Sequence, residues 1–161
     1  MHPRSFLAVF AALLSTFFVT GCALDPDWQG IQQARMQMQE EIKTEQPGNY
    51  YIGRRYYKQD YKFWGWVRQP GQPWSTAKLV MLNEQTKLAP DREQGHFGSD
   101  NGYEYKLYGN YSPDVVYEPA SDRQYPEFVL KGYELRSAAP ASIYPTSGAL
   151  DPERRVIIHP E

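Results

Sequence analysis

Hydrophobic residues follow two different spacings along this chain, and the change falls near residue 50. Upstream of that point, apolar residues recur three or four positions apart, which predicts one amphipathic helix within residues 22–49. Asp27 is a candidate N-cap, and Pro47-Gly48 ends the pattern. The opposite face is rich in glutamine and has no basic flank, so we expect the helix to pack on the rest of the protein rather than on a membrane surface or a partner. The repeating positions are Ile31, Ala34, Met38 and Ile42.

Downstream of residue 50, short aromatic and apolar segments with a period of two predict β-strands. The run Leu79-Val80-Met81-Leu82 is apolar throughout and predicts a strand that is packed on both faces. A polar stretch over 84–102 separates the first three segments from the others, and Pro70–Pro73 and Pro119–Pro126 are expected to be turns. The predicted strands are Tyr50–Lys58, Tyr61–Gln69, Ala77–Asn83, Tyr103–Tyr111, Val115–Glu118 and Glu127–Leu135.

Three glycines, Gly65, Gly109 and Gly132, fall inside the predicted strands. A glycine within a strand costs stability unless the strand bends tightly or another backbone approaches it, as happens in small coiled barrels. Together with the strand lengths and the long connection, this predicts an all-β fold, a small OB-like barrel of five or six strands with one short N-terminal helix. An SH3-like barrel or a small sandwich is the alternative.

Prolines recur at Pro140, Pro145 and Pro152 and predict an extended C-terminal tail, with Val156-Ile157-Ile158 as a possible edge strand. The chain therefore divides into four segments. They are a signal peptide over 1–21, a tether and helix over 22–49, a β-barrel domain over 50–136 and a proline-rich tail over 137–161.

The first 22 residues have the layout of an export signal. Arg4 supplies a basic start, Phe6–Val19 is an apolar run, and Thr20-Gly21 leads to Cys22, the single cysteine of the chain. The apolar run is too short to remain in a membrane as a spanning helix. The segment resembles bacterial lipoprotein signals, with Val19-Thr20-Gly21-Cys22 as the lipobox. An ordinary secretory signal with an incidental thiol is the alternative.

The resemblance implies cleavage between Gly21 and Cys22 and lipidation of the Cys22 thiol with a diacylglyceryl group carrying chains such as palmitate. Two or three acyl chains hold a protein on a bilayer for long periods. In this family an Asp after the cysteine often retains the protein at the inner membrane, and here that position is Ala23. We therefore expect a lipid-anchored protein of the bacterial cell envelope, at the outer membrane and facing the periplasm.

Composition shows what must stabilise the exported part. All 13 tyrosines and all 4 tryptophans lie downstream of Cys22, and no second cysteine is present to form a disulfide, so an aromatic core is expected. Charge is segregated along the chain: residues 22–49 carry a net charge of −3, residues 50–82 one of +5, and residues 83–161 one of −5. Prolines and glycines, 13 and 12 in number, divide the chain into short pieces.

The sequence offers no constellation for catalysis. The two histidines beyond the signal, His96 and His159, have no metal-ligand spacing, and Ser99 lacks the context of a nucleophile elbow. The acidic residues of the long loop, Asp91, Glu93 and Asp100, do not match a calcium loop and are expected to form a solvated turn. We expect no enzyme activity, no cofactor and no metal; an envelope hydrolase would need a cleft that joins His96 to acidic side chains.

Binding has some support in the segment Tyr61–Arg68. Alternation places two tryptophans on one face between two cations, a combination that suits stacking on rings together with anion binding. The same tryptophans would instead be structural if the N-terminal helix or the C-terminal tail covered them, with the cations extending around them. The candidate ligand-binding residues are Trp64, Trp66, Lys62 and Arg68, with Arg54, Arg55 and Trp74 nearby in the sequence.

Residues 50–136, with the lead-in Tyr50-Tyr51-Ile52-Gly53, the strand Phe63-Trp64-Gly65-Trp66-Val67 and the later Tyr108-Gly109, are loosely similar to OB-fold outer-membrane lipoproteins of the starvation-lipoprotein type. This resemblance implies a membrane-anchored envelope lipoprotein with a structural or protein-association role. The alternative is a module that binds a glycan or a lipid headgroup through the aromatic and basic strand. Export makes nucleic acid a poor candidate, so the expected partners are the membrane and an envelope glycan or protein.

Overall fold

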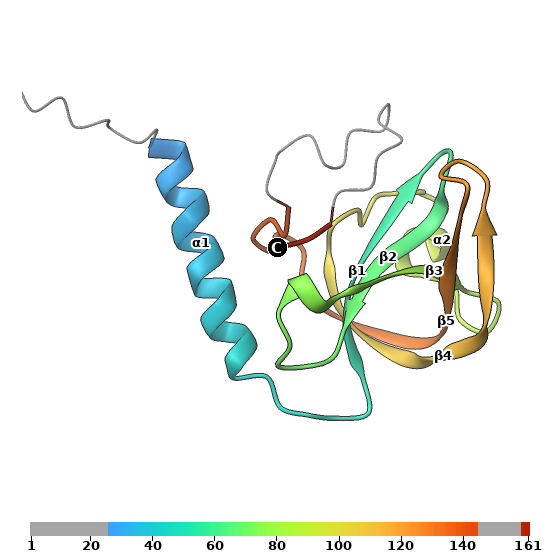
Figure 1. Ribbon diagram of the computed structural model, residues 1–161, viewed down its shortest axis with the longest axis horizontal. Coiled ribbons are helices and arrows are strands. Elements are labelled where there is room, and N and C mark those ends of the chain that lie inside the picture. Colours follow the sequence, from blue (N-terminus) through green and yellow to red (C-terminus); the bar gives the residue numbers. More distant parts are fainter. Residues whose placement is uncertain (1–25, 145–158) are drawn as a thin grey trace, which may run out of the picture.

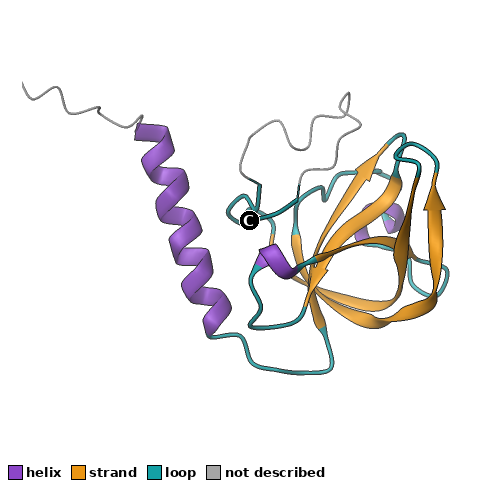
Figure 2. Ribbon diagram, in the orientation of Figure 1, coloured by secondary structure: helices purple, strands orange, loops and turns teal. Residues whose placement is uncertain are grey.

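A computed structural model describes residues 26–144 and 159–161. The signal peptide, Cys22 and the edge strand expected at 156–158 lie outside the described residues. Five strands and a long N-terminal helix make up most of the described chain (Figures 1 and 2). The elements are α1 (Pro26–Lys43), β1 (Tyr51–Lys58), β2 (Lys62–Arg68), the 3-10 helix η1 (Trp74–Thr76), β3 (Lys78–Asn83), α2 (Pro90–Glu93), β4 (Glu104–Glu118) and β5 (Arg123–Ser137).

The five strands close into a barrel in the order β1-β2-β3-β5-β4. β1 pairs antiparallel with β2 and with β4, and β4 pairs antiparallel with β5. β3 and β5 are the one parallel pair among the described strands, over Met81–Asn83 and Glu127–Val129. This arrangement confirms the predicted small all-β, OB-like barrel with an N-terminal helix.

Alternation along the strands divides the apolar side chains between two cores. Inward positions fill the barrel, whereas outward positions of β1 and β2 form a second core on the outer surface. The run Leu79-Val80-Met81-Leu82 supplies both, since Val80 and Leu82 point inward while Leu79 and Met81 pack on the outer core. The inner core is Val67, Val80, Leu82, Ala89, Tyr105, Leu107, Phe128 and Leu130. The outer core is Ile42, Ile52, Tyr56, Tyr61, Trp64, Trp66, Trp74, Ala77, Ile143 and Tyr144.

The second half of the barrel differs from the prediction. The segments predicted as separate strands at 103–111 and 115–118 are one strand, β4, because a register shift between Tyr111 and Val115 absorbs the intervening residues. The turn between β4 and β5 covers residues 119–122 rather than the predicted 119–126, and Pro126 lies inside β5. Pro126 pairs with Val115 of β4, and the pairing of β5 with β3 begins only at Glu127, so the missing N–H of the proline breaks no bond to β3.

Two of the three strand glycines sit where another backbone approaches. A Cβ on Gly65 would lie 2.6 Å from the carbonyl oxygen of Arg54, and one on Gly109 would lie 2.2 Å from that of Val129. Gly132 does not follow this rule, because the nearest atom to its Cβ position is 3.5 Å away on the Tyr108 ring. Close backbone approach, one of the two reasons predicted for a strand glycine, is therefore confirmed at Gly65 and Gly109 and does not account for Gly132.

Substitution of these glycines tests the closure of the barrel. We expect Gly109→Ala to lower the free energy of unfolding by about 1–3 kcal/mol, because the rigid backbone of β5 must move to admit the methyl group. Gly132→Ala, on the facing strand, is the matched control and should stay within about 0.5 kcal/mol of the wild type. Urea unfolding followed by circular dichroism measures both, and equal losses would show that strand propensity rather than close approach sets the cost.

The C-terminal half of helix α1 packs on the outer core, and the C-terminal segment of the chain is one of its partners (Figure 1). Ile42 is buried in the outer core, and Met38 packs against it. The Arg35 guanidinium donates hydrogen bonds to the carbonyl oxygens of Ser142 and Tyr144. Trp28 and Ile31 of the first turns remain largely exposed. Within the described residues, no helix has the length and apolar character needed to cross a membrane.

Candidate functional site

The predicted aromatic surface on β2 is buried. Trp64 is 1 % exposed and Trp66 is 3 % exposed, and both belong to the outer core. The C-terminal segment covers them: the Trp66 indole Nε1–H donates to the Tyr144 hydroxyl at 3.0 Å, and the His159 ring packs edge-on against Trp66 with centroids 4.7 Å apart. The expectation of an open stacking face is therefore not met. Both tryptophans are part of a core, which is the alternative that the sequence analysis gave.

Three of the predicted cationic and aromatic residues form a closed cluster on the same outer surface. The guanidinium groups of Arg54 and Arg68 lie over the Trp74 ring, 4.9 and 4.7 Å from its centroid. Arg54 pairs with Glu104 at 2.9 Å, and Arg68 pairs with Glu45 at 2.6 Å. All five side chains are nearly inaccessible to solvent, so this cluster joins the linker after α1 to β1, β2 and β4 and offers no anion site.

Glu45 is the central carboxylate of that cluster. Burial raises the pKa of its carboxyl group, but hydrogen bonds from Arg68, from the Gly71 N–H and from Arg136 outweigh burial and hold the pKa below its usual value. The ion pairs of Glu45 therefore stabilise the folded state above the ordinary carboxyl pKa. This stabilisation is lost as the pH falls through the lowered value.

Arg55 lies on the inward face of β1, at the end of the barrel that α2 covers. Its guanidinium contacts three buried carboxylates, with distances of 2.9 Å to Glu84, 3.0 Å to Asp91 and 2.6 Å to Asp100. The Tyr105 hydroxyl also donates to Asp100, at 3.1 Å. Arg55 therefore neutralises part of a buried acidic cluster and fixes the loop between β3 and β4 on the barrel.

This cluster corrects the prediction of a solvated turn for the long loop, since Asp91 and Asp100 are buried and only Glu93 is exposed. Burial raises the pKa of the Asp100 carboxyl group; Arg55 opposes this shift and the nearby Asp91 adds to it. Asp91 and Asp100 lie 36 and 45 residues from Arg55 in the sequence, and α2 was not predicted. The polar sequence of this loop gave no local signal for the long-range contact. Among the described residues, no group of side chains has the composition of a metal site.

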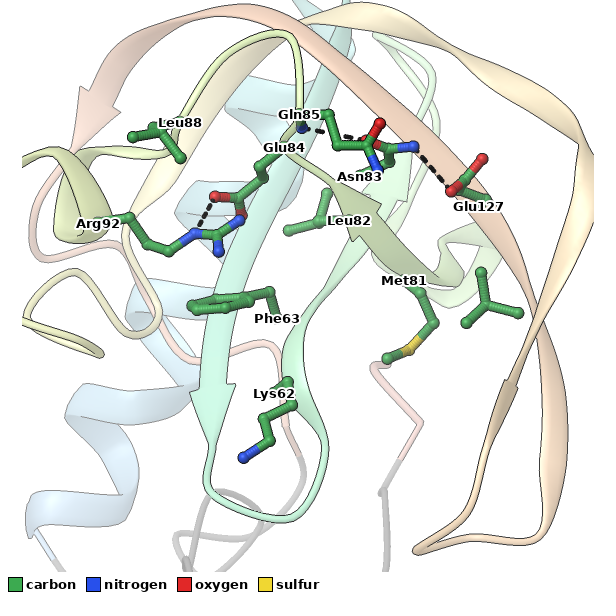
Figure 3. A pocket seen from close by; sticks show the side chains of 11 residues that line it. Lys62, Phe63, Met81, Leu82, Asn83, Glu84, Gln85, Leu88, Arg92 and Glu127 are labelled. Atoms are coloured by element: carbon green, nitrogen blue, oxygen red, sulfur yellow. Dashed lines mark hydrogen bonds and ion pairs between the residues drawn. The ribbon is translucent and has the colours of Figure 1, made fainter.

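The remaining predicted residue, Lys62, is exposed and stands at the rim of an open groove of about 480 Å³ (Figure 3). The groove runs between the ends of β2 and β3, the loop before α2 and the β4–β5 hairpin. Its apolar lining residues are Phe63, Met81, Leu82, Leu88 and Val116. Leu88 is 46 % exposed and places an apolar side chain on the rim of the groove.

Four of the polar side chains that line the groove are paired with one another. Arg92 donates to Glu84 at 2.8 Å and lies 3.8 Å from the centre of the Phe63 ring, and Asn83 donates to Glu127 at 2.9 Å (Figure 3). The described lining includes no histidine, cysteine or serine that would act as a base or nucleophile. His96, which a hydrolase cleft would need, is exposed after α2 and does not line this groove.

The chain matches no protein-family model, and comparison with curated proteins and with solved structures likewise found no match.

Proposed function

We propose that this protein is a lipid-anchored envelope lipoprotein, held at the outer membrane through Cys22 and facing the periplasm, whose barrel associates with a partner protein. The observation that carries the proposal is the open groove of mixed polar and apolar lining with the exposed Leu88 on its rim. Exposed apolar side chains with a polar surround are one form that protein–protein contact surfaces take. The residues that favoured glycan or headgroup stacking on β2 are used internally, which removes the main support for that alternative.

The position of α1 supports a tethered role. Cys22 precedes the helix by four residues, and an 18-residue helix is about 27 Å long. The first turns of α1 extend beyond the packed C-terminal half. An acylated Cys22 would therefore hold the barrel at a distance from the bilayer, with the groove free for a protein partner. The partner segment that suits the groove carries an apolar side chain for contact with Leu88 and polar groups that face the polar side chains around it.

Site-specific photo-crosslinking in intact cells tests both parts of the proposal. A photoreactive residue at position 88 should give one dominant protein adduct, whereas the same residue at the exposed position 131 on β5 should not. Val116→Lys, which places a charge in the groove, should reduce the adduct from position 88 at least several-fold. Cys22→Ser should remove the adduct as well, and the wild-type protein extracted from membranes should have an intact mass that begins at Cys22 and includes acyl chains.

Separate outcomes reject separate parts of the proposal. A Cys22→Ser protein that is still cleaved after Gly21 and partitions into detergent like the wild type would reject lipid anchoring. Equal adducts from positions 88 and 131, or an adduct that Val116→Lys leaves unchanged, would reject docking in the groove. Circular dichroism of Val116→Lys serves as the control for folding.

A further inference from the structure

A second pocket, of about 450 Å³, opens between the beginning of β3 and the beginning of β5. It forms because the parallel pairing of β3 with β5 starts only at Met81 and Glu127, so the preceding residues of the two strands diverge. Its volume suits a small molecule or a headgroup. The described lining residues are Trp66, Ala77, Lys78, Leu79, Arg123, Tyr125, Pro126 and His159.

The described lining is cationic and aromatic and includes no carboxylate. Lys78 and Arg123 are exposed and take part in no ion pair with another described residue. The Lys78 ammonium lies 5.3 Å from the centre of the Tyr111 ring, which orients it without neutralising it. His159 adds an imidazole beside Trp66. This contrasts with the groove near Leu88, whose lining includes the carboxylates Glu84 and Glu127.

The acidic residues nearest to Arg123 are occupied elsewhere. Glu118, which faces Arg123 across the β4–β5 pair, accepts hydrogen bonds from the Ala120 and Ser121 N–H groups at 2.8 and 2.7 Å. Asp122 accepts a hydrogen bond from the Tyr117 hydroxyl at 2.8 Å. The carboxylates of the turn thus accept hydrogen bonds from within the turn. The guanidinium of Arg123 remains available to an anion that enters the pocket.

We infer that this pocket binds the phosphate group of a phosphorylated sugar, with Arg123 and Lys78 as the anion ligands. Arg and Lys both form charge-assisted hydrogen bonds to phosphate oxygens, and Arg does so in a bidentate manner. The half-buried Tyr125 ring offers apolar surface on which the carbon face of a sugar ring would pack. The phosphorylated sugar has two sources, a soluble sugar phosphate or the headgroup of a phosphorylated glycolipid, and both present the same chemistry.

Isothermal titration of the full chain, purified in detergent, distinguishes the two sources. One titration uses soluble glucosamine 6-phosphate with glucosamine as its control. The other uses a phosphorylated glycolipid dispersed in the same detergent, with its dephosphorylated form as the control. Binding in the first titration identifies a soluble ligand, and binding only in the second identifies a headgroup. No binding in either titration would overturn the inference.

Charge variants then locate the site. Arg123→Gln should weaken binding about tenfold or more, the scale of one charge-assisted hydrogen bond, and Lys78→Gln should weaken it by a smaller factor. Lys131→Gln removes an exposed cation from β5 outside the pocket and should leave the affinity unchanged. Arg123, Lys78 and Lys131 are all exposed, so the three variants should unfold like the wild type. A loss of affinity in Lys131→Gln equal to that in Arg123→Gln would show non-specific charge attraction and would overturn the assignment.

Discussion

Arg55→Met is expected to lower the free energy of unfolding at pH 7 by about 3–5 kcal/mol, the usual cost of removing one partner from a buried ion pair. Methionine fills much of the space but leaves Glu84, Asp91 and Asp100 buried without their shared cation. Glu84 retains its hydrogen bonds from the Arg92 side chain and from the Ala89 N–H, and Asp91 retains two, from the Arg92 and Gly98 N–H groups. Asp100 retains only the Tyr105 hydroxyl among the described contacts and is therefore the carboxylate most affected.

The loss should depend on pH, and its sign follows from the cluster. In the wild type, burial already places the Asp100 pKa above its usual value, so folding favours the protonated form of this group and its contribution to stability grows as the pH falls through the raised value. Removing Arg55 takes away the main opposing charge and raises the pKa of the Asp100 carboxyl group further. The difference in stability between Arg55→Met and the wild type should therefore shrink between pH 7 and pH 5.

Denaturant unfolding at the two pH values measures this effect, and Arg123→Met, an exposed arginine exchanged in the same way, is the control. Arg123→Met should unfold like the wild type at both pH values. If Arg55→Met were as stable as the wild type at pH 7, the buried cluster would not hold the loop between β3 and β4. A loss that stayed constant with pH would show that packing rather than charge sets the cost.

The barrel was predictable because its evidence is local. Alternation and turn residues define each strand, and the cost of Gly65 and Gly109 within strands is offset only where another backbone approaches. The sequence did not predict that residues 104–118 form one continuous strand, which they do through the register shift near Pro113. A proline in the sequence looks the same whether it ends a strand or lies at a register shift.

The site was less predictable because its contacts are long-range. Alternation correctly placed Trp64 and Trp66 on one face, but it does not show whether another segment covers that face. The cover comes from Ile143 and Tyr144, almost 80 residues away, and from Ile42 of α1. The net positive charge of residues 50–82 likewise suggested an exposed basic surface. Arg54, Arg55 and Arg68 are instead buried in ion pairs with carboxylates on distant segments.

Trp64→Ala should lower the free energy of unfolding by about 3–5 kcal/mol, because it removes a large buried ring from the outer core. The indole stacks on Tyr56 with centroids 4.8 Å apart and also contacts the Tyr61 ring. Its Nε1–H has no hydrogen-bond partner among the described residues, so Trp64→Phe keeps the stacking, removes an unsatisfied donor and should cost clearly less than Trp64→Ala.

Trp28→Ala is the matched control, because this tryptophan of α1 is 43 % exposed and should contribute less than about 0.5 kcal/mol. Thermal and urea unfolding of the three variants measure the differences. The ordering Trp64→Ala, then Trp64→Phe, then Trp28→Ala follows from burial alone. A loss below about 1 kcal/mol for Trp64→Ala would mean that the C-terminal segment leaves the ring accessible in solution. In that case the aromatic strand would again qualify as a stacking surface, and the structural role of the outer core would need to be abandoned.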